Sequence, residues 1–170
     1  MGVTIHALGY DGDRLFAAIA RILEANALCA MATRSEGGIV HINMAYFCFS
    51  PDLVLYFLSH PESLHCRNFA HVPHIAVAVF NSGQAWGDPH VGLQLHGRAG
   101  RTDQDADHEA RELYGARFPR YREFLRHAVE APSRSGFPDL RFYRFVPERA
   151  QILDEWEFGE EVFIPATILR

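Results

Sequence analysis

Leu53-Val54-Leu55-Tyr56-Phe57-Leu58-Ser59-His60-Pro61-Glu62-Ser63-Leu64-His65-Cys66-Arg67-Asn68 is the stretch that decides the fold. Its first six residues favour a β-strand, and Pro61 favours the first turn of a short helix, with Ser59 or His60 as the cap. A helix N-terminus presents unpaired N–H groups and the positive end of a dipole, which suit an anion. Hydroxyls, imidazoles, a guanidinium and an amide gather there, so we expect this turn to bind a phosphorylated cofactor.

The stretches on both sides favour short antiparallel strands rather than a parallel α/β sheet, because tight turns connect them. Apolar residues at helical spacing predict one helix before them, over residues 11–26. We expect a mainly β fold: a single domain over residues 1–170, built as an antiparallel split β-barrel of six or seven strands. The predicted strands are 27–33, 39–49, 53–58, 75–80, 91–101, 140–146 and 150–156, with a turn at 147–149.

Two segments are expected to lie outside the core of this barrel. Residues 103–128 favour a polar helical insert with a break at Pro119. Residues 139–170 favour a C-terminal hairpin and an apolar tail, which is expected to dock on another surface, such as a second subunit. Within the predicted strand 39–49, alternation puts His41, Asn43 and Phe47 on one face and Ile42 and Met44 on the other.

Composition narrows the class of protein. The 170 residues carry a formal net charge of −5, and all 16 basic residues are arginines, which argues against a nucleic-acid partner. No secretory signal and no stretch long enough to span a membrane is evident, so a cytoplasmic location is expected. Cys29, Cys48 and Cys66 fit neither a disulfide framework nor a metal site, and we predict no metal. Cys29 and Cys48 read as core residues, whereas Cys66 is a candidate for exposure.

The order of these motifs resembles the pyridoxamine 5′-phosphate oxidase-like superfamily of FMN-binding split β-barrels, over about residues 12–101. Its members are typically homodimers with FMN at the subunit interface, so the resemblance implies both for this chain. The motifs are Cys29-Ala30-Met31-Ala32-Thr33 before a glycine turn, Ala45-Tyr46-Phe47, Leu55-Tyr56-Phe57, Ser59 with Ser63-Leu64-His65, Arg67-Asn68-Phe69, Pro73-His74-Ile75-Ala76-Val77 and Gly92-Leu93-Gln94-Leu95-His96-Gly97.

The same resemblance implies which residues bind the cofactor, but it assigns no catalytic residue. The implied residues are Met31, Ala32 and Thr33 beside the isoalloxazine ring, Ala45, Tyr46 and Phe47 on the neighbouring strand, Ser59, Ser63, His65, Arg67 and Asn68 around the phosphate, Trp86 in a loop, and Gln94 on the strand that returns from the partner subunit.

The sequence departs from the superfamily pattern at one residue expected to bind the phosphate. His65 stands where the superfamily often has lysine, and an imidazole with a pKa near 6.5 is only partly charged at neutral pH. Arg67 is expected to compensate by a bidentate contact. The chain also lacks the basic segments that bind pyridoxamine phosphate in the oxidase itself, so we do not predict vitamin B6 synthesis.

Three functions remain open at this point. The first is an FMN-dependent oxidoreductase that passes hydride or electrons to a small molecule, with FAD or a deazaflavin as alternative cofactors. The second is a haem-binding or haem-handling protein, because related barrels bind haem and the chain has 10 histidines. The third is a non-catalytic flavin-binding or sensor dimer. Candidate haem ligands are His41, His60, His65, His71, His74, His90 and His96.

Overall fold

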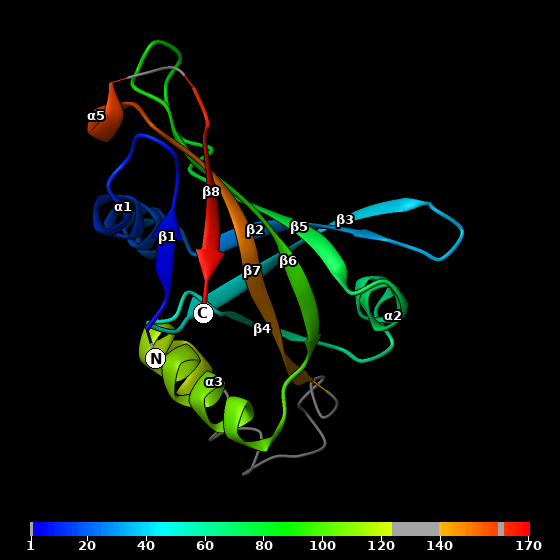
Figure 1. The fold of residues 1–170 in the computed structure, drawn as a ribbon. Helices are drawn as coiled ribbons and strands as arrows, with labels where there is room; N and C mark the ends of the chain where they lie inside the picture. The colour runs from blue at the N-terminus through cyan, green and yellow to red at the C-terminus, as the bar shows by residue number, and fades with distance from the viewer. Residues whose placement is uncertain (1, 124–139, 160–161) are drawn as a thin grey trace.

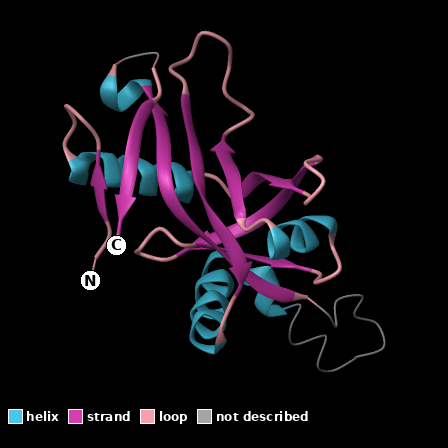
Figure 2. Cartoon of the chain, turned by 45° about the vertical axis from the view of Figure 1, so that its right-hand side comes forward, coloured by secondary structure: helices cyan, strands magenta, loops and turns pink. Residues whose placement is uncertain are grey.

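The structure is a computed structural model that describes residues 2–123, 140–159 and 162–170. Among these residues, no helix has both the length and the apolar character needed to cross a membrane. One antiparallel sheet dominates, with helices around it (Figures 1 and 2). Its strands are β1 (Thr4–His6), β2 (Leu28–Arg34), β3 (Val40–Phe49), β4 (Leu55–Ser59), β5 (His74–Phe80), β6 (Val91–Arg101), β7 (Arg141–Asp154) and β8 (Ile164–Leu169).

The sheet closes into a barrel because β7 pairs with β4 on one side and with β6 on the other. The barrel order is β7, β4, β3, β2, β5, β6, while β8 and then β1 extend the sheet beyond β7. Closure removes strand edges that would otherwise offer unpaired N–H and C=O groups. The expected antiparallel β-barrel is therefore confirmed, and the apolar tail docks within the chain as β8. The three-residue strand β1 was not predicted.

β7 runs without a break through Pro147, so the turn predicted at residues 147–149 was wrong. His96 pairs with Arg149 and Gly97 pairs with Pro147, which leaves Glu148 as the extra residue of a β-bulge. A bulge tolerates proline because the local ladder is already interrupted. Gly97 permits the close approach, since a Cβ there would collide with the Val146 carbonyl.

Helix α1 (Gly12–Ala25) packs its apolar stripe into the barrel core, as the residue spacing predicted. The Asp11 side chain accepts a hydrogen bond of 2.8 Å from the backbone N–H of Arg14, which caps the helix. Such a cap contributes about 1 kcal/mol. The buried residues of the stripe are Leu15, Ala18, Ile19, Ile22 and Leu23.

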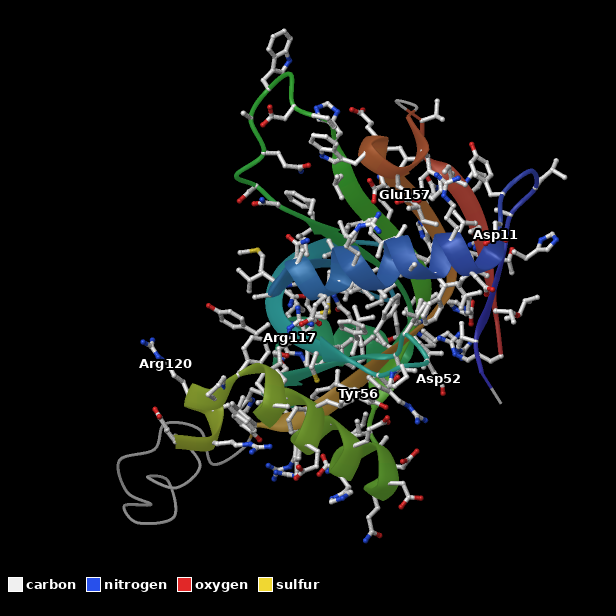
Figure 3. The ribbon with its side chains drawn as sticks, turned by 90° about the vertical axis from the view of Figure 1, so that its left-hand side faces the viewer. Asp11, Asp52, Tyr56, Arg117, Arg120 and Glu157 are labelled. Atoms are coloured by element: carbon white, nitrogen blue, oxygen red, sulfur yellow. The ribbon has the colours of Figure 1, made fainter. Side chains whose placement is uncertain are left out.

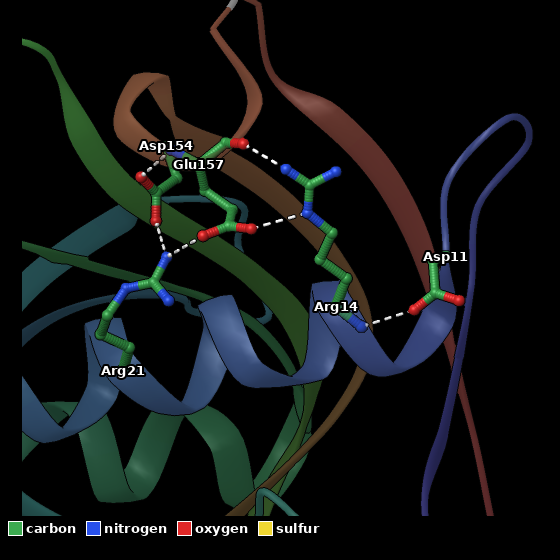
Figure 4. A network of polar contacts seen from close by, with 5 residues as sticks. All are labelled: Asp11, Arg14, Arg21, Asp154 and Glu157. Atoms are coloured by element: carbon green, nitrogen blue, oxygen red, sulfur yellow. Dashed lines mark hydrogen bonds and ion pairs between the residues drawn. The ribbon is translucent and has the colours of Figure 1, made fainter.

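A short helix, α5 (Glu155–Phe158), follows β7, so the strand predicted up to Trp156 ends two residues earlier. Figure 4 shows α5 tied to α1: Arg14 Nε lies 2.6 Å from Glu157 Oε1. Arg21 Nη2 lies 2.6 Å from Oδ2 of Asp154, whose side chain is buried. Ion pairs that involve exposed side chains contribute little to stability, so this network orients α1 more than it stabilises the fold.

Helix α3 (Gln104–Arg117) lies against β3, β4 and β7 on the outside of the barrel (Figure 1). It ends at Arg117, with Phe118 as its C-cap just before Pro119, and residues 119–123 are helical again, which confirms the predicted break. The rest of the predicted insert, up to residue 128, lies outside the described residues. Beneath α3 a second apolar cluster contains Cys48, Tyr56, Ala106, Ala110, Tyr114 and Phe142.

Candidate functional site

Ser59, Ser63 and His65 meet where β4 ends and helix α2 (Leu64–His71) begins. The His65 Nε2 atom lies 2.7 Å from the Ser59 hydroxyl and 3.1 Å from the Ser63 hydroxyl, and the two hydroxyls are 3.1 Å apart. Ser63, not Ser59 or His60, caps α2 by accepting from the Cys66 N–H. Pro61 lies in the preceding turn, because the extended backbone of Ser63 delays the helix by one turn.

The electrostatic state of this cluster depends on His65. Its half-buried position lowers the pKa of the imidazole, and the nearby charge of His41 lowers it further. The two rings are parallel, with centroids 6.5 Å apart. His65 is therefore neutral near pH 7, and the cluster presents neutral hydrogen-bonding groups at a helix N-terminus.

The cluster opens into a cavity of about 610 Å³ between β3, the end of β4 and the segment that follows α3. Ser59 and His65 line it on one side, together with Asn43, Ala45 and Tyr46 of β3. The pairing of β3 with β4 covers only Phe47–Phe49, so this edge of β3 lies unpaired next to the cavity among the described strands. Arg120 also lines the cavity, and the rest of the lining is apolar or aromatic: Met44, Leu58, Tyr114, Phe118, Tyr121 and Leu140.

Asn43 carries an unsatisfied polar atom at this cavity. Its Oδ1 is buried and has no hydrogen-bond partner among the described residues. A buried acceptor without a partner costs about 1–3 kcal/mol. The side chain therefore suits a bound molecule that brings an N–H or O–H donor.

Asn68 and Arg67 hold α2 in place. Asn68 Nδ2 donates to Thr33 Oγ1 at 3.1 Å in a buried contact that ties α2 to β2. Arg67 is exposed, and its Nη1 donates to the Glu62 carbonyl at 2.6 Å. Arg67 does not line the cavity. In this arrangement its guanidinium closes the turn before α2.

The remaining residues implied by the resemblance lie in three other places. Met31 and Phe47 are fully buried in the barrel core. Ala32 and Gln94 face the outside of the sheet and line a separate cavity of about 220 Å³. Trp86 is 98% exposed in the loop between β5 and β6. Within this chain, only Ala45, Tyr46, Ser59, Ser63 and His65 come together around the large cavity and its serine–histidine cluster.

The outer face of β3 carries a stripe of exposed apolar side chains: Val40, Ile42, Met44 and Tyr46, each between 55% and 72% exposed. Beside it the neighbouring strands present small side chains and then polar ones. The register gives two rows across the sheet, Ile42–Ala32–Ala76–His96 and Met44–Ala30–Ala78–Gln94. We call this surface the β3 face.

Sequence reasoning did not assign Asn43, or the aromatic residues of α3 and of the segment after it, to a site. Tyr114, Phe118 and Tyr121 read as contacts of a covering helix, and only the fold brings them opposite Asn43. The dense aromatic spacing around the Pro119 break was the one available signal. Cys66 is buried, so the exposed position considered for it was wrong. No group of three potential metal ligands occurs among the described residues.

The pyridoxamine 5′-phosphate oxidase family model matches residues 15–154 of this sequence, which is most of the chain. The chain belongs to the pyridoxamine 5′-phosphate oxidase family. This assignment agrees with the closed antiparallel barrel and with the motif order along the sequence. No curated protein matched the sequence.

Solved structures of three other proteins have the same fold as this chain. Atu2129 from Agrobacterium tumefaciens, a protein of unknown function, is 28% identical, with a TM-score of 0.62 over 80% of this chain and 55% of that one. A heme binding protein from Mycobacterium smegmatis is 18% identical, with a TM-score of 0.66 over 89% and 57%. A Clostridium acetobutylicum protein related to general stress protein 26, of the pyridoxinephosphate oxidase family, is 12% identical, with a TM-score of 0.63 over 92% and 96%. The chain thus spans little more than half of the first two proteins.

Proposed function

We propose that this protein binds FMN, with the phosphate at the Ser59–Ser63–His65 cluster, and that it transfers hydride or electrons to a small molecule. The observation that carries the proposal is the convergence of two hydroxyls and an imidazole within 3.1 Å of one another at the start of α2. Family membership supports flavin as the cofactor class. A cytoplasmic location remains part of this proposal.

The chemistry of the cluster fits a phosphate. Both hydroxyls can donate to phosphate oxygens, and His65 can donate through a ring N–H, which also carries a favourable charge once the imidazole is protonated. The N-terminus of α2 adds a favourable dipole, because its first N–H groups point toward the same place. Asn43 offers a second polar contact, since its buried Oδ1 needs a donor. These residues would bind and orient the cofactor, while bound FMN would supply the redox chemistry.

The second part of the proposal is a homodimer that forms through the β3 face. A contiguous exposed apolar surface of this kind is typical of an interaction site. The alanines of β2 and β5 would allow a partner's side chains to approach the sheet closely. Gln94 and Ala32 border the same face, so a flavin held between two copies would reach both them and the serine–histidine cluster.

Binding of FMN can be tested against riboflavin, which lacks the phosphate. Visible absorbance and quenching of flavin fluorescence would report the affinity of the wild-type protein for each. We expect FMN to bind at least tenfold more tightly, because one charge-assisted hydrogen bond contributes about 1.5–3 kcal/mol. The double substitution Ser59→Ala and Ser63→Ala should remove this preference, whereas Ser82→Ala, at an exposed loop position, should retain it.

Equal affinity for FMN and riboflavin would contradict the phosphate assignment, and no binding of either would contradict the flavin function. FAD and a deazaflavin belong in the same titration, because the chain does not specify the flavin. Turnover of a reduced nicotinamide by the FMN-loaded protein would separate an oxidoreductase from a non-catalytic flavin-binding dimer.

Haem is the second candidate, and one observation favours it. His65 lines a largely apolar cavity and could hold a haem there, and the ring of His41 lies parallel to it. A structurally similar protein from Mycobacterium smegmatis is a heme binding protein. Addition of haemin to the wild-type protein and to His65→Gln would test this function. A ligated Soret band that disappears in the variant would favour haem over FMN.

A further inference from the structure

The large cavity has a wall of aromatic side chains that extends from β3 to α3 and the segment after it. Tyr46 of β3 meets Phe118 edge to face, with ring centroids 5.6 Å apart and planes at 73°. Tyr114 lies 4.6 Å from Phe118 and 5.0 Å from Tyr121, measured between ring centroids. Aromatic side chains favour planar ring partners by offset stacking or edge-to-face contact. This wall therefore suits a flat apolar molecule.

The charge of the cavity lining is one-sided. Arg120 lines the cavity, and no aspartate or glutamate does so among the described residues. Figure 3 shows Arg120 projecting from the short helical segment after α3. Burial raises the pKa of Tyr114 and of Tyr121, so both hydroxyls stay protonated and act as neutral donors. A ligand with a cationic group would find no counter-charge among the described lining residues.

We propose that this cavity binds a small aromatic carboxylic acid, with its ring against Tyr46, Phe118 and Tyr121 and its carboxylate at Arg120. The role of this acid as the flavin's substrate rests on the proposed function, whereas its binding does not. Arginine suits a carboxylate because its planar fork makes two parallel hydrogen bonds.

The test uses three probes with one ring and different charges: trans-cinnamate, cinnamyl alcohol and cinnamylamine. Calorimetric titrations would be run on the protein as purified and again after saturation with FMN. Cinnamate should bind most tightly and cinnamylamine most weakly. Arg120→Gln should weaken cinnamate binding by about fivefold to tenfold and leave cinnamyl alcohol unchanged, the size expected for a partly exposed charged contact.

Arg122→Gln is the matched control, because Arg122 lies two residues away and pairs with Glu112 at the surface at 3.7 Å. It should leave all three affinities unchanged. Phe118→Ala should weaken cinnamate and cinnamyl alcohol alike, since both use the aromatic wall. An equal loss for Arg122→Gln, or no change for Arg120→Gln, would overturn the proposal.

The visible spectrum of the same samples separates this proposal from the proposed function. If FMN binds and cinnamate does not, the flavin function stands and the acid site is wrong. If cinnamate binds and FMN does not, the acid site stands without a redox role. If FMN displaces cinnamate, the aromatic wall belongs to the flavin itself, and the proposed role of the acid as the flavin's substrate fails.

Discussion

The guanidinium of Arg117 lies over the ring of Phe47, with its central carbon 4.9 Å from the ring centroid. The Nη2 atom of the same group donates to backbone carbonyls at the end of α1: Leu23 at 2.7 Å, Asn26 at 2.8 Å and Glu24 at 3.0 Å. One side chain at the end of α3 thus caps another helix and covers the barrel core. Carbonyls at a helix C-terminus lack partners within their own helix, so this contact satisfies them.

Replacement of Arg117 by methionine should destabilise the fold. The substitution retains an apolar stem but removes charge-assisted hydrogen bonds, about 1.5–3 kcal/mol, and a cation–π contact, about 0.5–2 kcal/mol. We expect the free energy of unfolding in urea to fall by about 2–4 kcal/mol. Arg122→Met, at an exposed position, should change it by less than about 0.5 kcal/mol. Equal stability of the two variants would mean that water replaces the Arg117 contacts without loss.

The bulge at Gly97 gives a second stability prediction. A Cβ at this position would collide with the Val146 carbonyl and would lie 2.7 Å from the Cα of Pro147, both of them backbone atoms that cannot rotate away. Gly97→Ala should lower the free energy of unfolding by about 1–3 kcal/mol. Gly100→Ala on the same strand has open space around it and is the control. If both variants unfold at the same denaturant concentration, the bulge adjusts and the steric argument is wrong.

Much of this barrel follows from local sequence pattern. Helix α1 could be predicted from the apolar stripe that contains Leu15, Ile19 and Ile22 and from the cap at Asp11. Strands could be predicted from runs such as residues 75–80. In both cases burial of one face makes apolar residues recur at the period of the helix or strand. The turn predicted at Pro147 failed for a physical reason. Proline tends to end a strand because it has no backbone N–H to donate. Here β7 forms a bulge opposite Gly97 of β6, and the bulge does not need that donor.

Only part of the candidate site could likewise be predicted from local sequence. Ser59, Ser63 and His65 are close in sequence, so their convergence could be predicted from one turn. Asn43 and Phe118 reach the same cavity only through the β3 register and the packing of α3, which are long-range contacts that no local pattern encodes.

FMN binding should be coupled to protonation of His65. Burial lowers the pKa of this ring, so it is neutral at pH 7.5, and a phosphate dianion would favour its charged form. Calorimetry at pH 7.5 in buffers of different ionisation enthalpy should show uptake of up to one proton per FMN. His65→Gln should abolish this uptake, whereas His71→Gln, at the other end of α2, should retain it. Proton uptake that survives in His65→Gln would assign the coupling to another group.

The same lowered pKa affects stability without a ligand. Because the folded pKa of His65 is below the ordinary value near 6.5, the unfolded chain binds this proton more tightly. Its contribution to stability is therefore fully present above pH 6.5 and is lost progressively as the pH falls below that value. In urea titrations, His65→Gln should show a smaller loss of stability than the wild type between pH 7 and pH 5.5.

The β3 face predicts the effect of a single charge on assembly. Ile42 is 64% exposed at the centre of the apolar stripe, so Ile42→Glu should leave the monomer folded and oppose burial of the stripe against a second copy. Light scattering after gel filtration should show a dimer for the wild type and a monomer for this variant. Leu8→Glu changes an equally apolar, 95% exposed residue outside the face and should remain dimeric.

A wild type that is monomeric at tens of micromolar would refute the dimer. A dimeric Ile42→Glu would place the interface elsewhere, and a monomeric variant that still binds FMN with full affinity would show that one chain suffices for the cofactor.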